Sequence, residues 1–213
     1  MKFECVDQYL QLLEQVDSWF SDSMRLCSTS IACREGCSSC CRGLFDITLL
    51  DAALLQRGFS RLSVTLQNEV KRRVNERLQQ LQLQWPEFTP PFILNRLPHD
   101  QWLHMPENDL TPCPLLGDDG RCMVYEHRPL TCRLHGLPQI GMQGDVLCDS
   151  YCTLNFQNCD PLSLVELRAD FDQFFQREVE LLSQFSQQLT GRSQTELDTF
   201  IPTALLIDFD RFA

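Results

Sequence analysis

Four cysteines lie within nine residues of one another near the start of the chain, at Cys33, Cys37, Cys40 and Cys41. The chain begins without an apolar run of signal-peptide length, so its thiols are expected to stay reduced and to act as metal ligands. A disulfide between Cys40 and Cys41 would be strained, because these residues are sequence neighbours. Six more cysteines follow at Cys113, Cys122, Cys132, Cys148, Cys152 and Cys159. The cysteine pattern therefore predicts a metal site.

The composition of the 213-residue chain predicts one globular domain with a real core, since 43% of its residues are hydrophobic and 22% are charged. Its net charge of -11 argues against nucleic acid as a partner, because phosphate binding needs clustered Lys and Arg. No stretch approaches the roughly 18 apolar residues that span a bilayer. We therefore expect a cytoplasmic protein with no membrane partner.

The spacing of apolar residues predicts two long helices that flank the cysteines and a third between them. The first covers residues 4–27, with its apolar stripe running from Val6 to Met24. The last covers residues 161–190, opened by Asp160 and Pro161 and closed by Gly191. The third covers residues 63–84 and ends at Pro86. Its predicted buried stripe is Leu66, Val70, Val74, Leu78 and Leu81.

Shorter elements are expected around the cysteines. Thr48 and Asp51 form a capping box that opens a short helix, with Gly58 as its stop. Asp119 and Gly120 predict a tight turn, with residues 121–125 as the second strand of a small hairpin. The many prolines of residues 86–114 exclude regular helix or central strand. Six apolar residues nevertheless predict that this segment is ordered: Trp85, Phe88, Phe92, Ile93, Leu94 and Trp102.

These patterns together predict a mainly α fold, in which helices surround an irregular cysteine-rich metal-binding core with at most a small β-hairpin. We expect a single domain over residues 1–213, with the cysteine core at about 32–159. The apolar tail from Phe200 to Phe209 is expected to pack back on this body.

Thiolates bind zinc and iron–sulfur clusters strongly, and four of them complete either centre. Cys37 and Cys40 have the spacing of one half of a zinc finger, but Cys113, Cys122 and Cys132 are spaced more widely than a zinc-ribbon pair. The spacing of Cys33, Cys37 and Cys40 also matches the radical-SAM loop. That loop usually carries an aromatic residue where this chain has Ser39, and no β/α alternation accompanies it. The metal is therefore left open between zinc and iron.

Four segments make a more specific pattern: Ala-Cys-Arg-Glu-Gly-Cys-Ser-Ser-Cys-Cys at 32–41, Cys-Pro-Leu-Leu at 113–116, Gly-Arg-Cys-Met-Val-Tyr at 120–125 and Arg-Pro-Leu-Thr-Cys-Arg at 128–133. Together they resemble the YkgJ-type cysteine-cluster family, described as zinc- or iron-chelating and related to the flagellin lysine-N-methylase FliB. The resemblance covers roughly residues 32–136. It implies that Cys148 or Cys152 adds a ligand to seven others: Cys33, Cys37, Cys40, Cys41, Cys113, Cys122 and Cys132.

Eight ligands would fill two four-coordinate sites or two clusters, and the spacing leaves open which sulfurs share a centre. Cys5 and Cys27 are predicted to be small buried apolar residues, whereas Cys159 is either a further ligand or a buried thiol. His135 could complete a mixed site, but a surface or hydrogen-bonded histidine is the favoured interpretation for all four: His99, His104, His127 and His135.

Arg128 and Arg133 lie beside the motif cysteines. Buried thiolate centres carry negative charge, which nearby cations and hydrogen bonds offset. We therefore predict that these arginines support the centre. The alternative is a surface ion pair with Glu126 or Asp119.

The sequence therefore predicts first a metal-binding protein whose zinc, iron or iron–sulfur centre serves an unknown reaction. The resemblance to FliB implies an alternative, a protein-lysine N-methyltransferase-like enzyme, although the chain lacks a Gly-x-Gly-x-x-Gly motif. An interaction adaptor organised by zinc is a third hypothesis.

Overall fold

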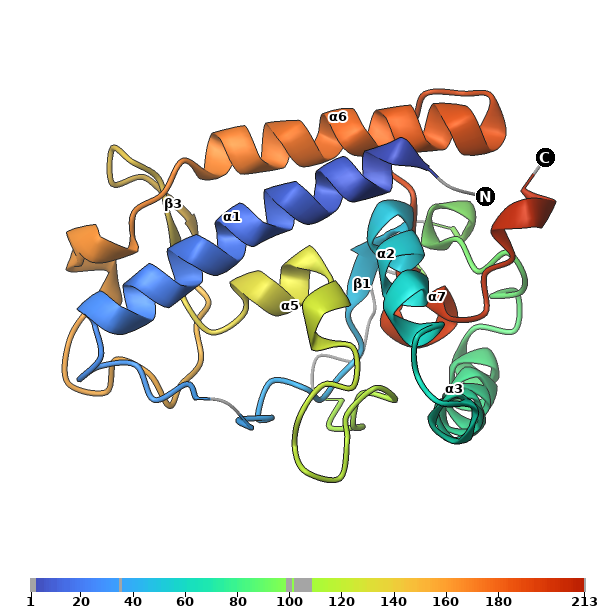
Figure 1. Cartoon of the computed structure of the whole chain (residues 1–213), viewed down its shortest axis with the longest axis horizontal. Helices are drawn as coiled ribbons and strands as arrows, with labels where there is room; N and C mark the ends of the chain where they lie inside the picture. The colour runs from blue at the N-terminus through green and yellow to red at the C-terminus, as the bar shows by residue number, and fades with distance from the viewer. Residues whose placement is uncertain (1–2, 35, 99–100, 102–108, 213) are drawn as a thin grey trace.

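The computed structural model of this chain describes residues 3–34, 36–98, 101 and 109–212. Two long helices, α1 (Glu4–Leu26) and α6 (Phe171–Thr190), run side by side along one edge of the molecule (Figure 1). Their buried faces pack against each other and against the shorter helices α2 (Leu49–Phe59) and α5 (Leu130–Leu134). The fold is mainly α, as the apolar spacing predicts.

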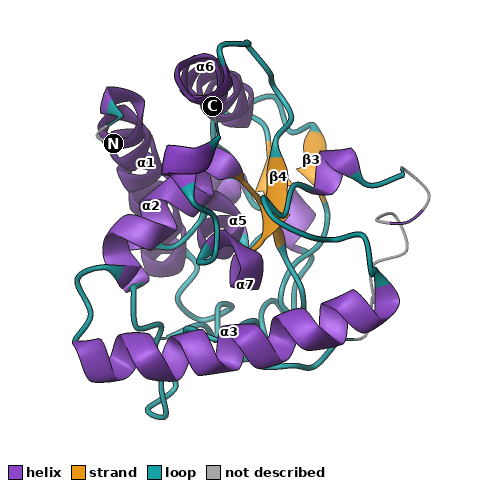
Figure 2. Ribbon diagram, turned by 90° about the vertical axis from the view of Figure 1, so that its right-hand side faces the viewer, coloured by secondary structure: helices purple, strands orange, loops and turns teal. Residues whose placement is uncertain are grey.

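Helix α3 (Val64–Gln84) crosses the base of the molecule as a surface helix (Figure 2). Its predicted stripe is buried at Val70, Val74 and Leu81. The prediction for Leu66 is wrong, because this side chain is 42% exposed. Leu66 lies in the first turn, where its amide donates to the capping hydroxyl of Ser63.

Two small antiparallel sheets complete the fold. Strand β1 (Asp46–Thr48) pairs with β4 (Asp198–Phe200), and β2 (Gln139–Ile140) pairs with β3 (Val146–Cys148). The first pair places Ile47 opposite Thr199. The chain's tail is therefore joined to the segment that follows the cysteine loop, residues 33–41.

The strand predicted over residues 121–125 is not formed. Only an isolated bridge joins Leu116 to Cys122 in this segment, and a 3-10 turn (Tyr125–His127) follows. The amide of Val124 donates to the Cys122 sulfur, so it is not free to extend a ladder. The hydrogen bond to the Cys122 sulfur therefore replaces the strand pairing predicted for this segment.

Helix α2 begins as its capping box predicts, with the Thr48 hydroxyl accepting from the Asp51 amide at 3.1 Å. Gly58 does not end the helix, which continues to Phe59. A Cβ at Gly58 would come within 2.7 Å of the His127 Cβ, so the glycine permits a close approach between α2 and the His127 segment.

The predicted start of the last helix at residue 161 is wrong. Asp160 instead caps a 3-10 turn (Pro161–Ser163), a second turn (Val165–Leu167) follows, and Asp170 caps α6. The indole of Trp19 donates to the Leu167 carbonyl at 3.0 Å, which removes that carbonyl from helical bonding. The helix ends at Thr190 with Gly191 left-handed at φ 73°, as predicted.

The proline-rich segment is ordered and the tail packs back on the body, as predicted. Together with the end of α3 they form a second, smaller core. Its members are Leu81, Trp85, Phe88, Phe92, Leu94, Leu97 and Phe200. A short 3-10 turn (Leu94–Arg96) and helix α7 (Ile201–Ala204) border this core. Trp102 lies outside the described residues. None of the helices described is long and apolar enough to cross a membrane.

Candidate metal centre

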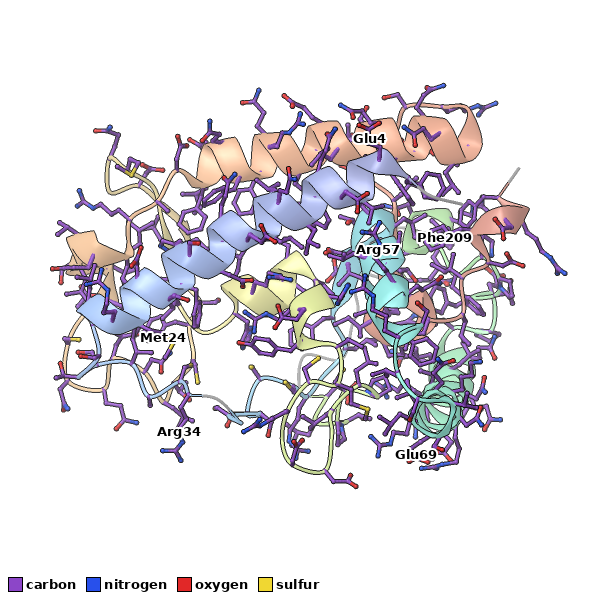
Figure 3. All side chains as sticks on the ribbon, in the orientation of Figure 1. Glu4, Met24, Arg34, Arg57, Glu69 and Phe209 are labelled. Carbon is purple, nitrogen blue, oxygen red and sulfur yellow. The ribbon has the colours of Figure 1, made fainter. Side chains whose placement is uncertain are left out.

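Cysteine side chains gather in the loops beside α5, where yellow sulfur atoms are visible in Figure 3. Four of them, which we call group A, come from three segments that meet at the N-terminal half of α5. Cys41 ends the cysteine loop, and its carbonyl accepts from the Cys113 amide at 2.9 Å. Negative charge on any of the other three sulfurs would raise the pKa of Cys41, so the four thiols lie close enough to interact electrostatically. Group A consists of Cys41, Cys113, Cys122 and Cys132.

Burial controls the ionisation of group A. It raises the pKa of Cys113 to about 12 and that of Cys132 well above its ordinary value. The Leu115 amide donates to the Cys113 sulfur and lowers its pKa, and the Val124 amide does the same for Cys122. Each donor lies two residues after its cysteine and would stabilise a thiolate. Cys113, Cys122 and Cys132 therefore favour the protonated form unless a cation takes the place of the protons.

Cys40 lies between group A and a second set of sulfurs. Its thiol donates to the Cys41 sulfur, which raises the pKa of Cys40 and lowers that of Cys41. The charge of Cys40 also acts on Cys33 and on Cys132. Cys40 is thus coupled both to group A and to the sulfurs described next.

The second set, which we call group B, consists of Cys33, Cys37 and Cys152. Charges on Cys152 and Cys37 both act on Cys33, whose pKa is raised by burial and lowered by a hydrogen bond from Asn155. Group B joins the start of the cysteine loop to the segment after β3. Of the two downstream candidates, Cys152 is the one placed beside the cysteine loop.

Asn155 holds the two segments of group B together. Its side-chain NH₂ donates to the Cys33 sulfur at 3.4 Å and to the Gly136 carbonyl at 2.7 Å. Its side-chain oxygen accepts from the Ala32 amide at 2.9 Å. The Gly136 carbonyl also accepts from the Cys152 amide. The sequence analysis missed Asn155, whose only signal is its position three residues after a motif cysteine.

The remaining cysteines lie elsewhere. Cys148 sits in β3 opposite Gln139. Cys5 and Cys27 are buried in the main core, as predicted. Cys159 is exposed, with its sulfur 3.5 Å from the Ser30 hydroxyl. This excludes the buried alternative for Cys159, and its role as a further ligand stays a prediction.

Arg128 and Arg133 connect the group A segment to α1. Both guanidinium groups pair with Asp17 of α1, and Arg133 is only 2% exposed. Arg133 also donates to the carbonyls of Arg128 and Glu126. The partner carboxylate is thus Asp17, and the predicted surface pair with Glu126 or Asp119 is not formed by these two arginines.

The positive charge of Arg128 lowers the pKa of Cys40 and of Cys122. Its guanidinium stacks on the Tyr125 ring at 3.9 Å from the centroid. The Arg128 Nε is buried and has no hydrogen-bond partner among the described atoms. A donor with spare capacity beside two thiols fits the chemistry of a thiolate centre.

The two histidines that the structure describes, His127 and His135, have partners other than the sulfurs of groups A and B. His127 is buried, with its Nε2 3.1 Å from the Arg61 guanidinium, in line with the hydrogen-bonded interpretation. The His135 ring packs edge-on against Phe45 at 5.8 Å, and burial lowers its pKa. His99 and His104 lie outside the described residues.

A cavity of about 390 Å³ separates α6 from α5 and the two small sheets. Tyr9 donates to Asp51 at 2.8 Å and to Glu178 at 3.2 Å, which joins α1, α2 and α6 beside this cavity. Burial raises the pKa of Asp51 to about 6 and that of Glu178 to about 8. The ionisable residues that line the cavity are Asp46, Asp51, His135, Cys148, Tyr151, Glu178 and Asp198.

Within the part of the chain that the structure describes, no three Cys, His, Asp or Glu side chains converge closely enough to hold a metal ion. The sulfurs of each group lie near one another but are not arranged as ligands around a common metal position. The donor set fits a thiophilic metal by its chemistry: reduced thiols, amide donors to two sulfurs, and a buried cation nearby.

Comparison with known proteins gives one family match. No curated protein and no solved structure matches the chain. The relation to FliB, and lysine methylation with it, therefore stays a prediction. The sequence model of the CxxCxxCC family, described as a "putative zinc- or iron-chelating domain", matches residues 32–153, which is more than half of the chain and includes both groups of sulfurs. The chain accordingly belongs to the CxxCxxCC family.

Proposed function

We propose that this protein chelates zinc or iron at two thiolate centres. Group A supplies four thiolates to one centre, and group B supplies three to the other. Cys40 is the fourth candidate ligand for group B, because its charge acts on Cys33. The observation that carries the proposal is the division of the motif cysteines into two sets of neighbours. The Cys113 amide donates to the Cys41 carbonyl in group A, and Asn155 joins Cys33 to the segment of Cys152 in group B.

The protein environment favours exchange of protons for metal. Burial raises the pKa of Cys113, Cys122 and Cys132 and so favours their neutral forms. A metal ion replaces those protons and cancels most of the thiolate charge, while the amides of Leu115 and Val124 donate to the sulfurs. Arg128 supplies further positive charge beside Cys40 and Cys122. A bound metal would supply a fixed charge that holds the loops together.

Metal binding should also order the cysteine loop. The segment from Cys33 to Cys41 has little regular structure, with backbone bonds such as Cys37 N to Arg34 O and Cys41 N to Ser38 O. Removal of the metal by a chelator should therefore increase amide hydrogen exchange in this loop more than in α3. Unchanged exchange in the loop would contradict a role for its cysteines in metal binding.

The decisive experiment is elemental analysis of full-length protein purified without oxygen. We expect about two zinc ions per chain, or iron with acid-labile sulfide and a broad brown absorbance. Colourless zinc protein would exclude native iron–sulfur clusters. Protein that contains neither metal, and binds neither after reduction, would contradict the proposed function.

Single cysteine variants test the division into two centres. Cys113→Ser should remove the metal of group A, and Cys37→Ser should remove that of group B, each leaving about one equivalent. Cys159→Ser is the matched control, because this exposed thiol belongs to neither group. Loss of both metals in either single variant would show that the sulfurs form one shared centre instead.

A further inference from the structure

Strands β2 and β3 form a ribbon with one open edge. Ile140 of β2 pairs with Val146 of β3 on one side. On its other side it bridges to Arg168, and its carbonyl accepts from the Ala169 amide at 3.0 Å. Strand β2 is therefore covered along both edges, whereas β3, within the described residues, pairs with β2 alone. The free edge of β3 lies at the side of the molecule, near the start of α6 (Figure 1).

The free edge carries exposed apolar side chains. Val146 is 46% exposed and Leu147 is 38% exposed. Met142, in the turn that joins the two strands, is 58% exposed. An unpaired edge offers N–H and C=O groups to another chain, and apolar side chains beside it become buried when that chain binds. Strand β3 therefore has the features of a site that accepts an extended segment.

The surroundings of the free edge are acidic. Asp145 precedes β3 and Asp149 follows it, and both are exposed. Neither forms an ion pair within the described part of the chain, and Arg168 lies instead against Gly144, in the turn. Cys148 of β3 also lines the cavity of about 390 Å³, which holds four carboxyl groups and no described Lys or Arg.

These charges select the kind of chain that can pair here. Two copies of β3 paired antiparallel around Leu147 would place Asp145 of each copy opposite Asp149 of the other, and like charges directly opposite each other destabilise a strand pair. A segment with Lys or Arg at both of those positions would instead form two pairs of opposite charge. The free edge therefore favours a basic segment over a second copy of this chain.

We propose that β3 binds an extended segment of a partner protein, in which an apolar centre is flanked by two basic residues. The main chain of the segment pairs with the free edge, and its centre covers Val146 and Leu147. Its basic residues pair with Asp145 and Asp149. This inference goes beyond the proposed function, because pairing at this edge requires no metal.

The test measures the binding of short peptides to full-length protein by fluorescence anisotropy. The probe is a labelled, capped peptide, Ser-Lys-Val-Thr-Val-Lys-Ser. A second peptide has Glu in place of both Lys, and a third carries N-methyl groups on both Val amides, which removes donors needed for strand pairing. We expect the basic peptide to bind about tenfold more tightly than either of the others at about 0.1 M salt, with the advantage over the acidic peptide reduced at about 1 M salt.

Variants of the edge make the test specific. Asp145→Asn combined with Asp149→Asn should reduce the preference for the basic peptide to about twofold or less, because the strand is kept but its charges are lost. Leu147→Lys should weaken binding of the basic peptide about tenfold, since it places a cation on the edge. The matched control is Glu76→Gln combined with Glu87→Gln, which removes the same charge from exposed positions on α3 and just after it, at the base of the molecule (Figure 2). It should keep the full preference.

Hydrogen exchange locates the bound peptide. The basic peptide should slow exchange of the β3 amides and leave those of α3 unchanged. Absence of binding, equal binding of the basic and acidic peptides, or a preference that survives loss of both aspartates would overturn the proposal. Equal binding of the N-methylated peptide would show that the segment does not pair as a strand. A wild-type dimer in sedimentation that Leu147→Lys converts to a monomer would assign the edge to a second copy instead.

Discussion

Group A and group B differ in how they are attached to the rest of the protein. Cys132 of group A lies on α5, which Arg133 fastens to Asp17 of α1 and Leu130 fastens to Asp51 of α2. Group B lies between two loop segments that Asn155 joins, beside a cavity of about 660 Å³. The same ligand type is therefore placed once against the helical core and once at an accessible edge. We therefore expect a metal bound at group A to support the fold more than one bound at group B.

The largest expected effect separates the two groups by their contribution to stability. Cys132→Ser should lower the free energy of unfolding by about 5 kcal/mol in metal-loaded protein, because loss of the centre releases α5 and both segments bound to it. Cys37→Ser should cost about 1 kcal/mol, since it releases only loop segments. Denaturant unfolding followed by circular dichroism gives both values. Equal losses in the two variants would remove the distinction between a core-attached and an edge centre.

The next effect concerns the link between group A and α1. Arg133→Ala should lower the free energy of unfolding by about 4 kcal/mol. It leaves Asp17 with Arg128 as its remaining partner, and the carbonyls of Arg128 and Glu126 lose their donor. The cost should appear in thermal unfolding, together with loss of metal from group A and retention in group B. Arg72→Ala is the control, since Arg72 makes only exposed ion pairs within α3. A change no larger than in this control would show that the link to α1 is dispensable.

A third effect is the pH dependence of the helices that surround group A. The pKa of Glu178 is raised from 4.5 to about 8 by burial and by the charge of Asp51, while Tyr9 donates to both carboxylates. The folded protein therefore binds more protons than the unfolded chain between about pH 4.5 and 8. Stability should fall as pH rises through this window and level off above it.

In the wild type, the free energy of unfolding should fall by about 2 kcal/mol between pH 6 and 8. Glu178→Gln should remove most of this decline. Below pH 6 the pKa of Asp51, raised to about 6, should still leave a slope of the same sign. Glu180→Gln is the matched control on α6, where Glu180 pairs with Arg177 at the surface. Chemical denaturation at a series of pH values gives the curves. A wild-type curve that stays flat from pH 6 to 8 would contradict the assigned pKa of Glu178.

Much of the fold could be predicted because helices leave a local record in the sequence. The apolar stripe of α1, the cap of α2 at Thr48 and the glycine after α6 each depend on residues within one or two turns. The errors occur where distant groups compete for the backbone. Trp19 takes the Leu167 carbonyl from the predicted start of α6, and the Cys122 sulfur takes the Val124 amide from the predicted strand.

The candidate site, like the fold, could be predicted only where the signal is local in the sequence. The cysteine spacing identified the motif residues but could not assign them to centres, because the neighbours of Cys33 and Cys41 come from segments up to about 120 residues away. Asp17 and Asn155 lie outside the spacing pattern, since their roles arise only when α1 and the segment after Cys152 reach the cysteine loops. Folding, and not spacing, brings these groups together.

The smallest expected effect is at the junction of group B. Asn155→Ala removes the donor to Cys33 and the hydrogen bonds to Ala32 and Gly136. It should lower the free energy of unfolding by only about 1.5 kcal/mol. The loss is small because the Ala32 amide can bond to water and the Gly136 carbonyl still accepts from the Cys152 amide. Metal affinity should fall at group B and stay unchanged at group A, measured by competition with a coloured chelator. Asn75→Ala, on the exposed side of α3, is the control. A loss at group A as well would mean that the two centres respond as one unit through Cys40, whose thiol lies between them.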